Sequence, residues 1–335
     1  MEHFRYNRPG QIVSKSQNLL TGYTPQYAIS ATVDYQYDYY GRLIRMQYPQ
    51  LAVPDGQGGY TARPRLTLDY AYDPMSRLQN ISLPNAQSLQ IANGAAYNAA
   101  GQLKSLTRPA QVNLGASPVT ADGMLAETFE YNTLGQITSQ VWAQPGMSVN
   151  LQYEYAAQGA SNDGRLYRRR DVVSGEEVTY LYDQLGRLTS ATTTGPEWGL
   201  SWTYDGFGNR LQQNVTKGSG LSVQMTVNPA TNRLSGTGYV YDSNGNLTNW
   251  PTPLGGVTAG YDATNQMTSV SAPNGTETYQ YSARRQRLFK HFGGTTLLSS
   301  KQYVYGAGGE LLGEYSACQV TPGVYVLCQD QVRVY

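Results

Sequence analysis

The sequence predicts an all-β protein, built as one long antiparallel meander of hairpins that forms a spiralling or barrel-like sheet. Three observations carry this prediction. A short turn motif recurs along most of the 335 residues. The segments between the turns are short and rich in Tyr, Val, Thr and Leu, as strands are. No ten-residue window shows the 3.6-residue periodicity of a helix.

The motif is clearest at residues 182–188, which predict one β-hairpin. Tyr182 ends a strand. Asp183 suits the first position of a type I turn, where its carboxylate accepts hydrogen bonds from backbone N–H groups ahead of it. Gly186 falls at the fourth position, where the chain often needs a positive φ that any Cβ disfavours. A type I turn closed by such a glycine is a common hairpin loop with a bulge.

The same pattern returns along the chain. Two further copies supply the turn pairs Asp38 with Gly41 and Asp242 with Gly245. In a deviant copy Asn265 replaces the glycine, and asparagine is the next residue most tolerant of a positive φ. Other copies begin at Tyr6, Tyr72, Tyr97, Tyr131 and Tyr305. The copies that carry one extra residue, which predicts a wider bulge, begin at Tyr204, Val227 and Tyr281.

Between successive copies lie irregular turns, which predict the second edge of the sheet. Strands joined in this way place uniform turns along one edge and variable turns along the other. Because variable loops can change without altering strand register, we expect a specific binding function at the variable edge. A flat open sheet of this width would expose its edge strands, so twist must coil it.

The composition argues against several classes of protein. Charges nearly balance, with 24 basic and 23 acidic residues, so nothing draws the chain to nucleic acid or anionic membranes. No apolar run approaches the roughly 18 residues that span a bilayer, so we expect no membrane insertion. Residues 1–15 lack the apolar core of a signal peptide. We expect an extracellular or cell-surface protein that is exported by another route, or an internal piece of a longer exported chain.

Tyrosine is the aromatic residue that dominates this chain, with 29 copies against 5 of phenylalanine. Tyrosine forms strands well and has an apolar ring with a polar tip. This excess of tyrosine favours a sheet whose faces are only partly buried over a tightly packed globular core.

Catalytic and metal-binding motifs are absent from the sequence. The two histidines, His3 and His291, lie in different parts of the repeat array, and no histidine-based metal or triad motif is present. The repeated aspartates are explained as turn residues rather than as paired carboxylates. We therefore expect no catalytic residue, no cofactor and no metal, and a protein that is not an enzyme.

Two basic clusters stand out from this neutral background. Residues 168–170 are three arginines in a strand-like segment, and Tyr281 is followed by Arg285, Arg287 and Lys290. On a strand, Arg285 and Arg287 share one face. Together with Tyr281 and Lys290 they are candidates for gripping a sulfated or acidic glycan by charge and stacking. The alternative is a solvated face whose charges protect the sheet from aggregation.

Cys318 and Cys328 flank a turn signal and are equally distant from Gly323. A three-residue loop there places them directly opposite each other in a hairpin, close enough for a disulfide. Closing so short a loop contributes about 2.5–3 kcal/mol in the chain-entropy model, and it implies an oxidising compartment. The alternative is a reduced pair in a cytosolic protein.

The Tyr-Asp-x-x-Gly-Arg-Leu unit resembles the YD repeat of the Rhs and YD-repeat proteins, which include bacterial polymorphic toxins, the BC shells of Tc toxins and the teneurins. The resemblance covers residues 6 to about 312. Residues 313–335 follow as a terminal hairpin, so one array is expected to fill residues 1–335. The resemblance implies a strip that spirals into a large hollow shell, which encloses a C-terminal toxin in some members.

One departure from that family pattern is informative. Shell-bearing members carry an aspartyl self-cleavage site in an Asp-Pro-x-Gly signature. Here the one Asp-Pro pair, Asp73-Pro74, lies inside an ordinary repeat turn. The chain therefore resembles a fragment, or a short stand-alone run, of YD repeats.

From these observations we expect a non-enzymatic shell or scaffold segment of a bacterial secreted or cell-surface protein, in a toxin-encapsulating or contact-mediating system. A carbohydrate-binding adhesion module is the alternative. The expected partners are a toxin polypeptide, a surface glycan or a second copy joined through sheet edges, and no nucleic acid. Residues 331–335 offer an unpaired edge, so we expect the end strands to be covered by closure of the strip or by another copy.

Overall fold

The computed structural model describes residues 2–20, 28–54, 59–86, 88–113, 120–293, 300–321 and 324–332. Within these residues all the regular structure is β-strand except one 3-10 turn, η1 (Pro84–Ala86). The strands follow one another as antiparallel hairpins. The prediction of an all-β meander is therefore confirmed. Among the residues described, no helix has the length and hydrophobicity needed to span a bilayer.

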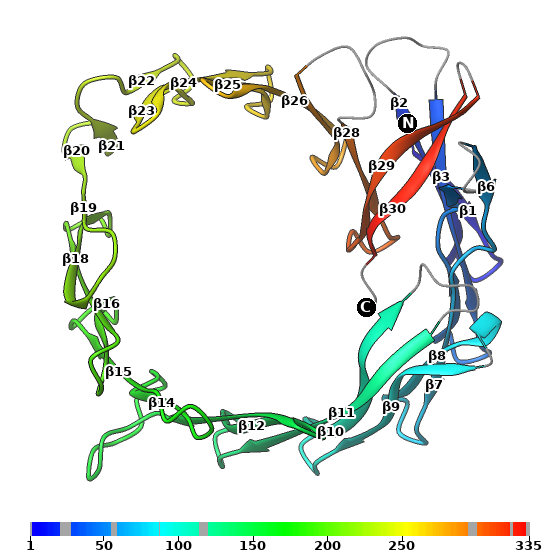
Figure 1. The fold of residues 1–335 in the computed structure, drawn as a ribbon, viewed down its shortest axis with the longest axis horizontal. Coiled ribbons are helices and arrows are strands. Elements are labelled where there is room, and N and C mark those ends of the chain that lie inside the picture. Colours follow the sequence, from blue (N-terminus) through cyan, green and yellow to red (C-terminus); the bar gives the residue numbers. More distant parts are fainter. Residues whose placement is uncertain are drawn as a thin grey trace. The chain divides into compact units, whose positions relative to one another are not determined.

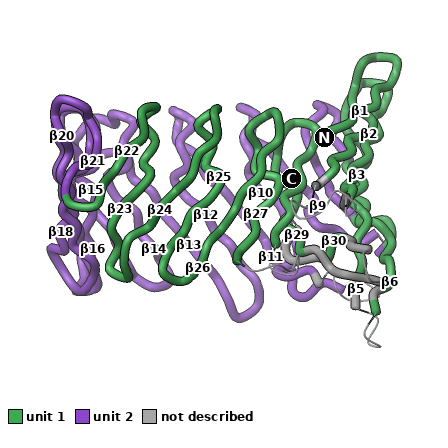
Figure 2. The backbone as a smooth tube through the Cα atoms, turned by 90° about the horizontal axis from the view of Figure 1, so that it is seen from above, with its two compact units in different colours: residues 1–70, 83–85, 237–335 green, residues 71–82, 86–236 purple. Residues whose placement is uncertain are grey.

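The chain divides into two compact units (Figure 2). Unit 1 comprises residues 1–70, 83–85 and 237–335, and unit 2 comprises residues 71–82 and 86–236. Unit 1 thus contains both ends of the chain, whereas unit 2 is one nearly continuous stretch of repeats.

Unit 2 is a meander in which each strand from β9 to β19 pairs with the next in antiparallel fashion. A separate pair, β20 and β21, follows. The strands are β8 (Leu78–Leu83), β9 (Leu89–Tyr97), β10 (Leu103–Asn113), β11 (Thr120–Tyr131), β12 (Ile137–Gln144), β13 (Met147–Glu154), β14 (Arg168–Asp171), β15 (Glu177–Tyr182), β16 (Leu188–Thr193), β17 (Trp198–Tyr204), β18 (Arg210–Gly218), β19 (Val223–Gln224), β20 (Thr226–Asn228) and β21 (Arg233–Ser235).

Within unit 2 the strands from β12 to β18 form a single layer (Figure 1). Val178 and Ala191 are buried on one face, whereas Leu181 on the other face is 56% exposed. Most side chains of these strands are half-buried. A single layer cannot enclose large apolar side chains, so its stability rests mainly on contacts between neighbouring strands. This explains why the strands are rich in Thr, Ser and Tyr rather than in Leu and Ile.

Unit 1 consists of two sets of strands. The N-terminal set pairs in the order β1, β2, β3, β4 and β7, and the C-terminal set pairs in chain order from β22 to β30. The strands are β1 (Glu2–Tyr6), β2 (Ile12–Leu20), β3 (Ala28–Tyr37), β4 (Leu43–Gln47), β5 (Ala52–Pro54), β6 (Tyr60–Ala62), β7 (Thr67–Tyr72), β22 (Val240–Tyr241), β23 (Leu247–Thr252), β24 (Gly255–Tyr261), β25 (Met267–Ala272), β26 (Gly275–Tyr281), β27 (Arg287–Phe292), β28 (Ser300–Tyr305), β29 (Leu311–Thr321) and β30 (Val324–Val332).

The N-terminal set packs against the last repeats, as Figure 1 shows for β2, β3 and β28–β30. Gln17 Nε2 donates to the Tyr303 backbone oxygen at 2.7 Å, and the Tyr35 hydroxyl accepts from the Ala307 N–H at 2.9 Å. Here unit 1 has a layered core. Its buried apolar side chains are Ala31, Val33, Tyr35, Met46, Tyr48, Leu68, Tyr70, Phe289, Val304, Leu312, Tyr315 and Leu327.

The outer edge of the last strand also has a neighbour within unit 1. Strand β30 pairs in parallel with β5 through Cys328 and Ala52, and β5 pairs with β6. Pairing of the terminal edge within the chain was one of the two expected outcomes. Residues 333–335, part of the segment predicted to present that edge, lie outside the described residues.

Candidate functional site

The repeated turn is a compact hydrogen-bonded unit, and the turn at Asp183 shows all its parts. The Gly186 N–H donates to the Asp183 backbone oxygen at 2.9 Å, and the Asp183 N–H donates to the Arg187 oxygen at 3.0 Å. Asp183 Oδ1 accepts from the N–H groups of Leu185 and Arg187, and Oδ2 accepts from Arg187 Nε at 2.6 Å. Gly186 has a φ of +77°. Both oxygens of the Asp183 carboxylate are therefore satisfied within the turn.

The other candidate turn residues have the same arrangement. Asp38 accepts from Arg42 Nε at 2.7 Å, and Asp242 accepts from Asn246 Nδ2 at 2.8 Å. Gly41, Gly245 and Asn265 have φ values of +82°, +91° and +63°. The aspartate and the residue four positions later thus act together, and these carboxylates are held in turns rather than directed at a ligand.

Next to each turn, the tyrosine of the motif joins its repeat to the preceding one. The Tyr204 hydroxyl donates to the Leu188 oxygen at 2.7 Å, and the Tyr182 hydroxyl donates to the Leu166 oxygen at 3.0 Å. Equivalent bonds come from Tyr37, Tyr97, Tyr131, Tyr155, Tyr261, Tyr281 and Tyr305. Sequence reasoning missed this role. The signal for it was the excess of Tyr over Phe at one fixed position, because phenylalanine cannot donate this bond.

The residue four positions after the aspartate makes a second link along the same edge, in the other direction. Arg187 Nη1 donates to the Asp205 oxygen at 2.6 Å, and its guanidinium lies 5.0 Å from the centre of the Tyr204 ring. Where this residue is glutamine the link persists, since Gln102 Nε2 donates to the Gly135 oxygen at 2.9 Å. Along the uniform edge, bonds of these two kinds therefore link many of the described turns to their neighbours.

Acidification is expected to weaken these turns. The Arg187 N–H and, with it, the Arg187 guanidinium hold the pKa of Asp183 below its usual value, against an opposing effect of burial. The pKa is lowered likewise at Asp38, Asp73, Asp205, Asp242 and Asp262. A depressed folded-state pKa stabilises the fold above the unfolded value of about 3.9, and this contribution is lost as the pH falls through the folded value.

The measurement is the urea midpoint at constant ionic strength between pH 7 and pH 3. We expect the midpoint to fall below about pH 5, and we expect Asp183→Asn to flatten part of that fall. A midpoint that stays constant down to pH 3 would show that the turn aspartates contribute no pH-dependent stability.

A wider bulge was predicted for the copies that begin at Tyr204, Val227 and Tyr281. This prediction is wrong for the copies at Tyr204 and Tyr281, which have the ordinary turn. In the copy that begins at Tyr204, the Gly208 N–H donates to the Asp205 oxygen as in the ordinary turn. The extra residue there is Arg210, which pairs with Tyr204 in the place that leucine takes elsewhere. The turn after Val227 is longer, since the Asn232 N–H reaches back to the Asn228 oxygen at 2.8 Å. An extra residue is therefore absorbed by the strand or by the turn.

The geometry of the repeated turn also places the predicted glycan-binding residues in different elements, a turn and two strands. Arg285 lies in the turn at a φ of +61°, at the position of the glycine, and β27 begins only at Arg287. The expectation that Arg285 and Arg287 share a strand face is therefore wrong. The Arg287 guanidinium stacks over the Tyr279 ring at 4.3 Å, and Lys290 Nζ pairs with Glu277 Oε1 at 2.7 Å.

Tyr281 is likewise committed to the sheet, because its hydroxyl donates to the Met267 oxygen at 2.8 Å. The structure thus brings together Tyr279, Arg287, Glu277 and Lys290, and it leaves Arg285 at the turn edge. Burial, together with a hydrogen bond to Glu277, raises the pKa of Tyr279 to about 12. Glycan binding by these residues stays a prediction.

The three arginines of residues 168–170 lie on strand β14, so the strand predicted for this segment is confirmed. Arg168 pairs with Glu154 at 2.6 Å and with Glu177 at 3.0 Å, and Arg169 pairs with Glu176 at 3.0 Å. Neighbouring strands therefore neutralise much of this cluster. An anionic ligand would have to displace these carboxylates.

The two cysteines lie on paired strands, but the prediction that they stand directly opposite each other is wrong. Cys318 pairs with Val326, and Cys328 pairs with Ser316. Thr321 pairs with Val324, and the register shifts by one residue just before it, so the loop is shorter than the expected three residues. Cys328 is buried and disulfide-bonded. The Cys318 side chain lies outside the described residues.

We predict that the bridge joins Cys318 to Cys328, the two cysteines of the sequence. Under non-reducing conditions the intact mass should be about 2 Da lower than after reduction, because a disulfide lacks two thiol hydrogens. Cys318→Ser should melt at a lower temperature and keep β-type circular dichroism. Two alkylatable thiols in protein from an oxidising compartment would rule the bridge out.

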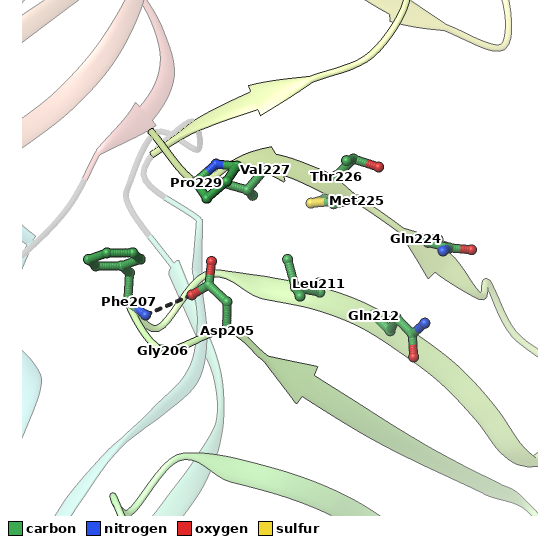
Figure 3. Close-up of a pocket in the computed structure, with 10 residues that line it drawn as sticks. All are labelled: Asp205, Gly206, Phe207, Leu211, Gln212, Gln224, Met225, Thr226, Val227 and Pro229. Atoms are coloured by element: carbon green, nitrogen blue, oxygen red, sulfur yellow. Dashed lines mark hydrogen bonds between the residues drawn. The ribbon is translucent and has the colours of Figure 1, made fainter. Parts of the chain in front are cut away.

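A concave feature of unit 2 lies on the uniform edge, apart from the turns themselves. A cavity of about 430 Å³ opens between the turn that starts at Asp205 and the next turn (Figure 3). Its apolar lining is Phe207, Leu211, Met225, Val227 and Pro229, and its polar lining includes Gln212 and Gln224. No group of His, Cys, Asp or Glu that could hold a metal occurs among the residues that the structure describes.

Comparison with known proteins finds one family match and several solved structures with the same fold. Residues 241–277 match the family model of the RHS repeat. The fold aligns with the crystal structure of TcdB2-TccC3-Cdc42 at a TM-score of 0.68 and 17% identity, over 94% of this chain and 16% of that one. The chain thus contains an RHS repeat at these residues and shares the fold of that structure. The resemblance to YD repeats seen in the sequence is therefore confirmed.

Two further solved structures share the fold of this chain. TcdB2-TccC3-TEV aligns at a TM-score of 0.66 with 15% identity, over 94% of this chain and 17% of that one. The Tc holotoxin pore of Photorhabdus luminescens aligns at 0.64 with 16% identity, over 92% and 17%. The chain thus spans about a sixth of the length of these chains. No curated protein matches it.

Proposed function

We propose that this chain is a non-enzymatic wall segment of a larger shell of the RHS-repeat kind, part of a bacterial secreted or cell-surface protein that encloses a toxin polypeptide or mediates contact. The observation that carries the proposal is the double link between successive turns. In most of the described repeats the tyrosine hydroxyl binds the preceding repeat, and Gln102, Arg187 and Asn246 bind the following one. Such links let a single layer of strands persist without a second layer.

The chemistry of the turns supports a structural role over a catalytic one. The carboxylates that recur along the uniform edge are occupied by N–H groups and by the side chain four positions later. A general acid or base needs a carboxyl group that can reach its substrate. The Tc complexes that share the fold contain partners such as Cdc42, named with TcdB2 and TccC3 in one structure. Enclosure of a polypeptide by this chain is part of the proposal.

The test uses the natural reading frame that contains residues 1–335, with everything it encodes on either side. If the chain is a shell wall, polypeptide outside these residues should resist a protease until the wall is opened by denaturant or by Gly186→Val. Equal cleavage of that polypeptide with the wall intact and opened would overturn enclosure. A frame that encodes no further polypeptide would do the same and would leave only the scaffold role.

A carbohydrate-binding adhesion module is the second candidate, favoured by the Arg287 guanidinium stacked on Tyr279. On a heparin column with a salt gradient we expect elution below about 0.15 M salt, because Lys290 is neutralised by Glu277 and isolated surface charges are screened. Retention well beyond that point, reduced by Arg287→Gln and Arg285→Gln but not by the ion-paired control Arg168→Gln, would favour the glycan reading.

A further inference from the structure

The copy of the repeat that begins at Tyr155 carries an insertion. Its leucine comes eleven positions after its tyrosine, whereas the copy at Tyr182 has a spacing of six, so five residues are extra. These residues, 156–160, form a small loop in which the Ala160 N–H donates to the Ala157 oxygen at 2.9 Å. We call residues 156–160 the inserted loop.

The sheet does not need the inserted loop, because the links from this repeat to the next are the usual ones. Gly164 has a φ of +88°, as the turn glycine has elsewhere. Arg165 Nη1 donates to the Asp183 oxygen at 3.2 Å, and the Tyr182 hydroxyl donates to the Leu166 oxygen at 3.0 Å. The insertion therefore has a cause other than the pairing of the strands.

Four tyrosines lie on one face of the sheet beside the inserted loop. The register of β13, β14 and β15 continues one position beyond Arg168 and places Tyr155, Tyr167 and Tyr180 side by side. Residues directly opposite each other on antiparallel strands point to the same face. Tyr182, two positions after Tyr180 on the same strand, shares that face as well.

A cavity of about 240 Å³ lies between this face and the inserted loop. Its walls are the four tyrosines and the three alanines of the inserted loop. Its other polar side chains are Ser161, Asp163 and Arg165. The cavity is thus mainly apolar with a few polar groups at its rim, which is the usual make-up of a small-molecule site.

Two hydroxyl groups of the cavity have no role in the fold. Those of Tyr155 and Tyr182 donate to backbone oxygens of the preceding repeat. Those of Tyr167 and Tyr180 make no hydrogen bond within the part of the chain that the structure describes. Burial raises the pKa of Tyr180, so water reaches this hydroxyl only in part. A partly buried hydroxyl without a partner costs free energy, which a polar atom of a ligand would recover.

The lining selects a neutral ligand. Asp163 Oδ2 accepts from Arg165 Nε at 2.7 Å, so the two charges of the cavity compensate each other and neither is left for an anion or a cation. The Arg165 guanidinium also lies 5.4 Å from the centre of the Tyr182 ring, where a cationic ligand would have to stack. A sugar ring fits what remains, because it has an apolar C–H face for the tyrosine rings and hydroxyls for the polar rim.

We propose that the cavity beside the inserted loop binds a neutral saccharide through one sugar ring, which stacks on the tyrosines and bonds to the hydroxyls of Tyr167 and Tyr180. The proposal does not rest on the shell function, and it uses none of the residues of the heparin experiment. It places binding on the uniform edge rather than on the variable edge where the sequence predicted it. A site for one ring binds with a dissociation constant of about 1 mM.

Saturation-transfer difference NMR tests the proposal with the methyl glycosides of glucose, galactose, mannose and N-acetylglucosamine. At least one of them should receive saturation from the protein. Deletion of residues 156–160 restores the spacing of six and should abolish the transfer. This deletion leaves Ser161 at the place of the aspartate, which Ser282 fills in another turn. Circular dichroism checks that the variant keeps its β-structure.

A milder variant removes only one hydroxyl. Tyr167→Phe keeps the ring and should raise the dissociation constant about three- to tenfold, because the sugar loses one hydrogen bond. Tyr153→Phe is the matched control, since Tyr153 lies on the same face of β13 but outside the cavity lining, and it should leave binding unchanged. If the deletion variant does not fold, the contrast between these two variants decides.

Three outcomes would overturn the proposal. One is the absence of transfer to all four glycosides. Another is transfer that neither the deletion nor Tyr167→Phe reduces. The third is a preference for choline or for adenosine monophosphate over every glycoside, which would assign the cavity to a cationic or an anionic ligand.

Discussion

Gly186→Val is expected to lower the free energy of unfolding by roughly 1–3 kcal/mol. Gly186 has a φ of +77°, which β-branched residues adopt poorly. Crowding is not the cause, because the nearest side-chain atoms to an added Cβ belong to Arg165 at 3.9–4.0 Å, an ordinary contact distance. The loss comes from backbone strain and from the weakened turn bond between the Gly186 N–H and the Asp183 oxygen.

Two variants separate this explanation from a general sensitivity of the turn. Gly186→Asn should be much milder than the valine variant, because Asn265 fills the same position with a φ of +63°. Gly206→Ala is the matched control, since Gly206 lies in a turn of the same type, has no positive φ and has no atom within 4 Å of an added Cβ. Urea unfolding gives the three values. Equal losses for Val and Asn at residue 186 would show that the turn geometry is wrong.

Local features of this fold could be predicted from the sequence because local chemistry determines them. A type I turn needs an acceptor at its first position and a residue tolerant of positive φ at its fourth, and Asp183 and Gly186 identify both. The antiparallel order of the strands follows from the short turns that join them, because each turn reverses the direction of the chain. The same reasoning counted an extra residue in the copy that begins at Tyr281 and did not see that its ordinary turn runs from Ser282 to Arg285, so it placed Arg285 on a strand.

Non-local features could not be predicted in this way. Nothing near Tyr182 in the sequence shows that its hydroxyl binds Leu166, since the acceptor is a backbone oxygen of another repeat. The cysteine register depends on a one-residue shift before Thr321 that has no sequence signal.

The packing of the two ends of the chain against each other in unit 1 could not be predicted from the sequence. Lys15 is the most deeply buried charged side chain in this contact. Lys15 is 1% exposed. Its Nζ lies 2.9 Å from Glu2 Oε1 and 3.1 Å from the Gly306 oxygen, 291 positions away in the chain. A buried ammonium is tolerated only because these oxygens and the Phe4 ring, 5.8 Å away, surround it.

Lys15→Ala is therefore expected to lower the free energy of unfolding by about 3–5 kcal/mol, the usual loss when one member of a buried ion pair is removed. Glu2, also largely buried, would keep its charge without its partner, and Gly306 would lose a donor. Lys15→Met combined with Glu2→Gln should cost less than Lys15→Ala, because it removes both charges and keeps most of the side-chain volume. Urea unfolding of the single and double variants gives the coupling energy.

Lys104→Ala is the control, since Lys104 is exposed on β10 and its loss should change stability by less than about 0.5 kcal/mol. Hydrogen exchange adds the location of the damage. In Lys15→Ala, β28 and β29 should exchange faster than in the unaltered protein, because their contacts with β2 and β3 are weakened, while β15–β17 of unit 2 should be unchanged. If Lys15→Ala costs no more than Lys104→Ala, the two ends of the chain are not held together at Lys15 in solution.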